Sequence, residues 1–201
     1  MATSQERKRQ NLRVVDDEQA RATRSRLLAA VREIAAENVQ RPSVTLLCER
    51  SGVARSTFYT HFATVEDLAV QALTEVFGEV SADDVRRRIQ HRESGRDIAR
   101  DGLDRVIAAL EGSRELLDYT IGIGSRAAVL ESLIGQFAAS TLVTVVTEYS
   151  ELDASVQAFI NDYVSAGTAH TILAWMENPG ARGRDDLIEQ LVDLLPARLV
   201  S

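Results

Sequence analysis

The chain has 201 residues, 45% hydrophobic and 26% charged, a balance that argues against disorder and provides enough apolar residues for a buried core. One cysteine excludes an internal disulfide and a cysteine-built metal site, and neither a signal peptide nor an apolar run of roughly 20 residues is present, so we expect a soluble cytoplasmic protein without metal, cofactor or membrane contact. The net charge of −7 is unevenly spread, because residues 1–62 carry 11 Lys or Arg against 7 Asp or Glu, whereas residues 63–201 carry 12 against 23.

A basic N-terminal part on an acidic body directs one face of a protein toward phosphates. Residues 1–15 have no apolar periodicity and contain Arg7, Lys8, Arg9 and Arg13, so we predict a flexible basic arm. The arm would follow a phosphate track or enter a minor groove, or else remain a solvated tail with only non-specific affinity for DNA.

The first predicted helix runs from about Asp17 to Asn38 and would form the back of a DNA-binding unit over residues 16–68. Its apolar residues recur at helical spacing and form one stripe, which comprises Leu27, Leu28, Val31, Ile34 and Ala35. The Gln40-Arg41-Pro42 stretch would end it. Arg24, near its start, would either contact a backbone phosphate or stay solvated.

The stretch from Ser43 to Leu68 predicts a helix-turn-helix followed by a third helix. Ser43 precedes the first helix, where its hydroxyl can accept a backbone N–H of the first turn. Gly52 would end that helix with a positive φ, which glycine adopts without steric cost, and Val53 would be buried beneath the turn. The second helix, from about Arg55 to His61, places Phe58 and Phe62 on one face.

The opposite face of this second helix is polar, basic and aromatic, as expected of a recognition helix in the major groove. The predicted DNA contacts are Arg55, Ser56, Thr57, Tyr59, Thr60 and His61, together with Ser43 and Arg24.

At these residues the chain resembles the tetracycline-repressor (TetR) family of bacterial regulators. Gly52-Val53, Ser56-Thr57-Phe58-Tyr59, His61-Phe62 and Glu66-Asp67-Leu68 stand in the order of that family. The rest of the chain resembles it only in length and helical pattern. Two positions depart from the family: Ala54 replaces the usual Ser or Thr that caps the recognition helix, and Val65 replaces the usual Lys that binds a phosphate.

Residues 69–201 predict a helical ligand-binding and dimerisation domain, so the expected fold is all-α. Thr64 and Asp67 start a helix that the Ser81-Ala82-Asp83-Asp84 stretch would end or redirect, and a charged run from Arg86 to Arg96 would be a solvated connection. The later helices are expected at about 98–112, 114–121, 126–150, 154–178 and 185–195, with 126–150 mostly buried. Cys48 is expected to be a small buried hydrophobe, or else a redox sensor.

The long helices carry many bulky apolar positions, and the resemblance implies a cavity for a small apolar effector among them. The polar or aromatic groups that would orient the effector are Tyr119, Phe137, Thr141, Tyr149, Tyr163 and His170, although each would otherwise simply fill the core. A homodimer is expected through the last two helices.

No phosphate-binding loop, metal-ligand spacing or nucleophile-plus-base pattern occurs, so we expect no catalytic residue and no enzyme. The predicted function is a ligand-responsive repressor that binds double-stranded operator DNA as a homodimer at an inverted repeat and is released by a small apolar molecule. The alternative is a helical small-molecule-binding dimer that has lost operator binding, which Ala54 and Val65 make conceivable.

Overall fold

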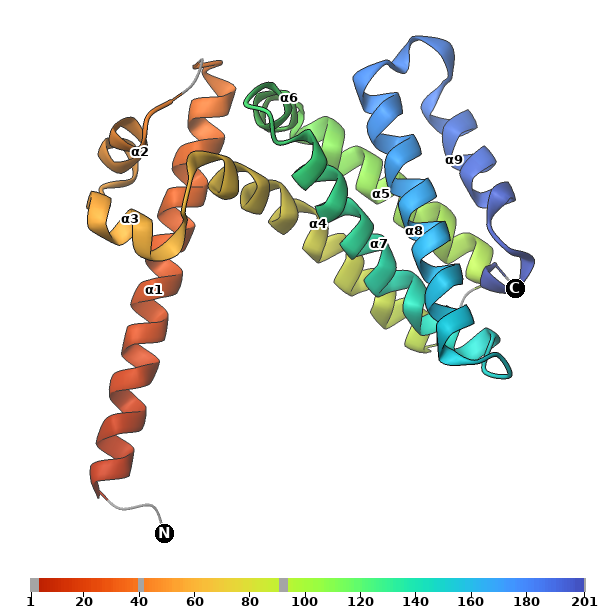
Figure 1. The fold of residues 1–201 in the computed structure, drawn as a ribbon, viewed down its shortest axis with the longest axis horizontal. Coiled ribbons are helices and arrows are strands. Elements are labelled where there is room, and N and C mark those ends of the chain that lie inside the picture. Colours follow the sequence, from red (N-terminus) through yellow and green to blue (C-terminus); the bar gives the residue numbers. More distant parts are fainter. Residues whose placement is uncertain (1–3, 40–41, 91–93, 201) are drawn as a thin grey trace. The chain divides into compact units, whose positions relative to one another are not determined.

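A computed structural model describes residues 4–39, 42–90 and 94–200, and these residues form helices, turns and connections without a strand, which confirms the all-α fold. The helices are α1 (Ser4–Ala36), α2 (Val44–Ser51), α3 (Arg55–His61), α4 (Val65–Gln90), α5 (Gly95–Gly112), α6 (Arg114–Gly122), α7 (Arg126–Glu148), α8 (Ala154–Glu177) and α9 (Arg184–Leu194), with 3-10 turns η1 (Pro179–Ala181) and η2 (Ala197–Leu199) (Figure 1).

The chain divides into two compact units, of which the first ends at Ala72 and the second begins at Leu73. α4 contains this boundary, so one continuous helix contributes residues to both units.

The first unit packs α1 to α3 and the start of α4 around one apolar core. Each helix contributes a fully buried side chain, and these include Leu27, Ile34, Leu47, Phe58 and Leu68. Close packing of such side chains holds the two short helices α2 and α3 in place, because helices of seven or eight residues are not stable alone.

The helix expected to begin near Asp17 begins at Ser4 instead, so the predicted flexible arm is helical from Ser4 onward. Residues 1–3 of that arm lie outside the described residues. Gln, Glu, Arg and Lys have high intrinsic helix propensity, which extends α1 without requiring an apolar face. At its other end, Asn38 adopts a φ of +53°. Gln40 and Arg41, where the sequence predicts the break, also lie outside the described residues.

The turns of the helix-turn-helix have the predicted hydrogen bonds. Ser43 Oγ accepts the Leu46 N–H at 3.2 Å and caps α2. Gly52 has a φ of +65°, as the left-handed end of α2 requires. At the start of α4, the Asp67 N–H donates to Thr64 Oγ1 at 3.0 Å, and the Thr64 N–H donates to Asp67 Oδ2 at 3.1 Å, a reciprocal cap.

In the second unit, α7 and α8 lie side by side as an antiparallel pair, and α9 packs against α5 (Figure 1). The apolar side of α9 is buried inside the chain by this packing, through Leu187, Ile188, Leu191 and Val192.

α4 does not end at the Ser81–Asp84 stretch, as the sequence predicted, but continues to Gln90. The acidic residues there are paired inside the fold: Asp83 accepts hydrogen bonds from Arg86 and Arg105, and Asp84 accepts one from Arg88 at 3.2 Å. These ion pairs neutralise the carboxylates, so this polar stretch remains helical. Part of the charged run is therefore structural; His91, Arg92 and Glu93 lie outside the described residues.

α7 is less buried than predicted. It is long and apolar enough, by length and composition alone, to cross a membrane, yet only 22% of its most apolar window is buried in the single chain. On this helix Leu142 and Val146 are 45% and 49% exposed. A helix with one side packed against its neighbours and another apolar side exposed is typical of a subunit interface, whereas the sequence pattern alone could not separate core from interface positions.

Candidate nucleic-acid interface and ligand site

Two aromatic side chains hold α3, the helix that the sequence predicts to contact DNA, against the core of the first unit. Phe58 is fully buried and Phe62 is 6% exposed, and their ring centroids lie 6.2 Å apart. Tyr59 points away from this core and is 54% exposed, although its ring still meets the edge of Phe58 at 5.3 Å. Phe58 thus sets the orientation of the helix, and Tyr59 presents its hydroxyl outward.

The polar residues predicted to contact DNA lie around the same outward side of α3. Arg55, Ser56 and Thr60 are exposed, and Thr57 and His61 are half-buried. Two of them are held by short-range contacts: Arg55 Nη1 donates to Thr45 Oγ1 at 3.3 Å, and Thr60 Oγ1 donates to the Ser56 carbonyl at 3.1 Å. The set combines hydroxyl groups with one guanidinium, the chemistry that contacts base edges and phosphates.

Ser43 and Arg24 have structural contacts of their own. The Ser43 hydroxyl caps α2, and the Arg24 guanidinium lies over the Phe62 ring at 5.3 Å from its centroid. Both side chains therefore support the position of the helix-turn-helix, whatever they contact outside it.

Ala54 stands at the N-cap of α3 and provides no side-chain hydrogen bond. Val65 is the half-buried first residue of α4. Cys48 is buried, and burial raises the pKa of its thiol, which suits a small core residue better than a reactive one. Ala54 and Val65 therefore lack the capping and phosphate-binding groups that Ser or Thr and Lys would provide at these positions.

The second unit contains two adjoining cavities between α4, α5, α7 and α8. The space outside protein atoms is about 330 Å³ in one and about 410 Å³ in the other, and both figures include space that is open to solvent. We call the first the apolar lobe, because half of its lining residues are large and apolar: Phe77, Val80, Val106, Leu133 and Phe137. We call the second the polar lobe, because Arg88, Thr141, Ser165 and Thr168 line it.

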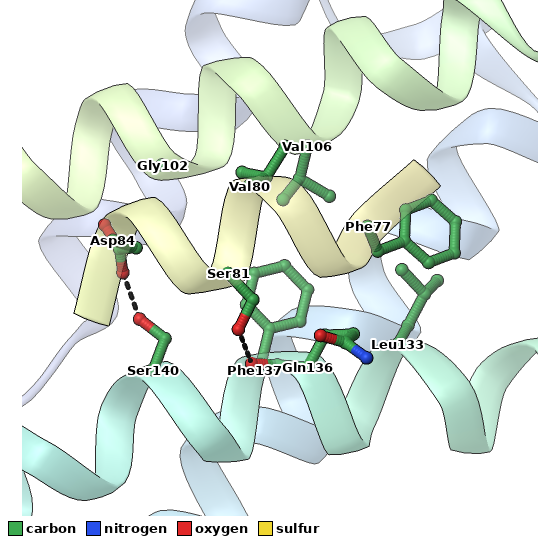
Figure 2. Close-up of a pocket in the computed structure, with 10 residues that line it drawn as sticks. All are labelled: Phe77, Val80, Ser81, Asp84, Gly102, Val106, Leu133, Gln136, Phe137 and Ser140. Atoms are coloured by element: carbon green, nitrogen blue, oxygen red, sulfur yellow. Dashed lines mark hydrogen bonds between the residues drawn. The ribbon is translucent and has the colours of Figure 1, made fainter. Parts of the chain in front are cut away.

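The two lobes share Asp84, Gly102, Phe137 and Ser140. Figure 2 shows Asp84 on α4 beside Gly102 of α5, with the Ser140 hydroxyl of α7 donating to Asp84 Oδ2, while Phe137 lies farther along α7. Arg88 Nε donates to the same carboxylate oxygen at 3.2 Å, and Arg88 Nη1 donates to Thr144 Oγ1 at 2.9 Å. A buried ion pair with hydroxyl partners thus stands where the lobes meet.

Sequence reasoning missed this ion pair, because it treated Asp84 as a helix breaker and Arg88 as part of a solvated run. The i, i+4 spacing of an acid and an arginine was the available signal. Their side chains are only 9% and 10% exposed, which the sequence does not reveal.

The predicted ligand residues do not all meet at these lobes. Phe137 lines both, and Thr141 lines the polar lobe. Tyr149 is half-buried beneath Arg198, whose guanidinium lies 5.1 Å from the ring centroid, and Tyr119 is half-buried on α6. Tyr163 and His170 are exposed on α8 and line neither lobe, because they lie on a different side of α8 from Ser165 and Thr168.

The exposed side of α7 and α8 forms a second distinct surface. Phe159 and Tyr163 are 70% and 73% exposed and stack with ring centroids 6.4 Å apart, and Leu142 and Val146 are exposed on α7. We call these four residues the α7–α8 face. Large apolar side chains grouped in this way usually mark a protein–protein contact.

Among the described residues, no group of three or more His, Cys, Asp or Glu side chains has the arrangement that would hold a metal ion.

Comparison with known proteins places the chain by its fold. No family model matches the chain, and no curated protein does. Solved structures do match: the dihydroxyacetone kinase operon activator DhaS has a TM-score of 0.59 and 16% identity, with 88% of this chain and 96% of that chain covered. The transcriptional regulator FadR from Bacillus subtilis, in complex with stearoyl-CoA, has a TM-score of 0.56 and 18% identity over 88% of this chain and 97% of that chain.

The fatty acid degradation regulator FadR from Bacillus halodurans has a TM-score of 0.55 and 16% identity over 86% of this chain and 94% of that chain. The fold of this chain is therefore one that transcriptional regulators use.

Proposed function

We propose that this chain is a ligand-responsive, dimeric transcriptional regulator of the tetracycline-repressor (TetR) family that represses its target genes. The observation that carries the proposal is α3 itself, a short helix anchored by buried Phe58 and Phe62 with hydroxyl, guanidinium and phenol groups on its outward side. A core-packing helix would have no need of such an outward set, whereas a major-groove helix needs it for phosphates and base edges.

Within this proposal, the residues of α3 have two kinds of role. Tyr59 donates its hydroxyl to a phosphate and so positions the helix without selecting a sequence. Ser56 and Thr57 lie three and two residues before Tyr59 and contact base edges, together with Arg55. Thr60 and His61 complete the contact at the end of the helix.

The dimer forms through the α7–α8 face rather than through α8 and α9. Because α9 already buries its apolar side within the chain, only the exposed Leu194 at its end remains for a partner. The α7–α8 face, by contrast, is apolar and exposed. Two copies related by a two-fold axis would form a four-helix contact, and the operator would be an inverted repeat.

Release from DNA follows from a small, mainly apolar effector that enters the two lobes. Only three residues separate the end of α3 from the start of α4, and the later α4 residues Phe77 and Val80 line the apolar lobe. An effector against these residues shifts α4 and with it the recognition helix. Moving the population from 99:1 to 1:99 against DNA binding requires about 5.5 kcal/mol of differential affinity.

The alternative is a helical small-molecule-binding dimer that no longer binds an operator. The uncapped Ala54 and the valine at position 65 favour it, since each removes an interaction that supports DNA binding.

Selection of bound fragments from the source genome with the purified full-length protein separates the two functions. The regulator predicts enrichment of a few fragments that share an inverted repeat, and loss of that enrichment on Thr57→Ala. Equal recovery of all fragments, or recovery of no fragment, would support the alternative instead.

A further inference from the structure

The junction of the two lobes contains hydrogen-bonding atoms that the protein itself leaves unused. Asp84 Oδ1 is buried and accepts no hydrogen bond from any described residue, although Oδ2 accepts two. In the polar lobe, Ser165 is fully buried, and its hydroxyl likewise has no partner within the described part of the chain. Buried polar atoms are normally satisfied, so unpaired ones that line a cavity indicate where a guest hydrogen-bonds.

Glycine at position 102 explains how the Asp84 carboxylate fits against α5. A Cβ at this position would lie 3.0 Å from Asp84 Oδ1, closer than side-chain carbons normally approach an oxygen. The absence of a side chain on Gly102 therefore keeps the carboxylate at the junction, where it lines both lobes.

The charge at this junction is already balanced. Arg88 is paired with Asp84 and also donates to Thr144, so its guanidinium does not supply an uncompensated positive charge. A buried anionic head group would lie next to the Asp84 carboxylate, and a cationic one would lie next to the Arg88 guanidinium. Both would lose their hydration without a net opposite charge to offset it.

We propose that the effector is a neutral amphiphile whose hydrocarbon part fills the apolar lobe and whose hydroxyl or amide N–H donates to Asp84 Oδ1, with Ser165 as a second hydrogen-bonding partner. This inference rests on the proposed function for its regulatory meaning, but the binding itself does not require DNA. Asp84 Oδ1 accepts a hydrogen bond from the guest without proton transfer, and the hydrogen bonds that Arg88 and Ser140 donate to Oδ2 hold the carboxylate in position.

The test uses four straight-chain probes of nearly equal size, titrated calorimetrically into the full-length protein without DNA. The probes are 1-octanol, heptyl methyl ether, octanoate and octylammonium. Heptyl methyl ether has as many heavy atoms as 1-octanol but no donor. A charge-assisted hydrogen bond to a buried carboxylate predicts that 1-octanol binds about ten- to hundredfold more tightly than the ether. The two charged probes should bind more weakly than 1-octanol.

Two variants identify the atoms involved. Gly102→Ala keeps both Asp84 and Arg88 but places a Cβ 3.0 Å from Asp84 Oδ1, which must then move by a few tenths of an ångström, so it should reduce the preference for 1-octanol over the ether. Ser165→Ala removes only one unpaired oxygen, folds without strain, and should weaken 1-octanol severalfold. The matched control is Thr171→Ala on the same helix, whose hydroxyl already donates to the Gly167 carbonyl at 2.8 Å and should not affect binding.

Tightest binding by octanoate or octylammonium, equal binding of alcohol and ether, or no binding of any probe would overturn the inference. So would a preference for 1-octanol that is unchanged in both Gly102→Ala and Ser165→Ala. If the protein prefers 1-octanol as expected but selects no genomic fragment, the ligand-site proposal stands and the proposed regulatory function is wrong.

Discussion

Truncation of Phe159 to alanine should weaken the homodimer, because this side chain is one of the two exposed aromatic rings of the α7–α8 face. It is 70% exposed in the single chain and stacks on Tyr163, so most of its surface is available to a partner. Complete burial of a phenylalanine contributes about 1.5–3 kcal/mol, so the exposed part contributes about 1–2 kcal/mol per copy.

Two-fold symmetry places this residue twice in the interface, which doubles the expected loss to about 2–4 kcal/mol per dimer. At 1.4 kcal/mol per factor of ten, the dimer dissociation constant should rise about 30- to 700-fold in Phe159→Ala. Sedimentation velocity over a concentration series measures this constant directly.

Leu194→Ala is the matched control. Leu194 is 81% exposed on α9, at the end of the helix pair that the sequence favoured for the dimer, yet outside the α7–α8 face. Its removal should leave the dissociation constant unchanged. An unaltered constant in Phe159→Ala, or a large rise in Leu194→Ala, would place the interface elsewhere.

Three further substitutions test separate parts of the account. Tyr59→Phe should weaken selected and scrambled DNA alike, by about 1 kcal/mol at fixed salt, since it removes one phosphate hydrogen bond; a loss confined to selected DNA would contradict this role. Val65→Lys should steepen the log–log salt dependence of binding by about 0.9, and an unchanged slope would separate this position from the phosphates. Arg126 donates to Glu177 at 2.7 and 2.8 Å and holds the pKa of that carboxyl below its ordinary value of 4.5, so this stabilisation is present above pH 4.5 and lost as the pH falls through the lowered pKa. Glu177→Gln should therefore be less stable than the parent at neutral pH and converge with it in acid, as followed by chemical unfolding at several pH values; a constant difference would refute the linkage.

The sequence predicted the local structure of the helix-turn-helix well, because short-range chemistry decides it. A serine before a helix, a glycine after it, and a Thr–Asp pair three residues apart each specify one turn, and Ser43, Gly52 and Thr64 with Asp67 behave accordingly. Helix spacing likewise identified Phe58 and Phe62 as buried residues.

Long-range partners decided the features that the sequence missed. Asp83 and Asp84 look like helix breakers in the sequence, but Asp83 pairs with Arg105, twenty-two residues away, and Asp84 accepts a hydrogen bond from Ser140 on α7. The same limit applies to the ligand site, because an apolar stripe does not reveal which side faces a cavity and which faces a partner. Tyr163 therefore qualified as a pocket residue by spacing, although it is exposed.

The most direct test of sequence-specific DNA binding through α3 is the affinity ratio between a selected genomic fragment and its scrambled counterpart, measured at one salt concentration for the parent protein and for Ser56→Ala with Thr57→Ala. Both residues belong to the outward side of α3, away from the buried Phe58. Loss of base-edge hydrogen bonds should lower the ratio about tenfold or more while affinity for scrambled DNA changes little. A ratio that stays the same in the double variant would contradict the assignment of α3 as the recognition helix.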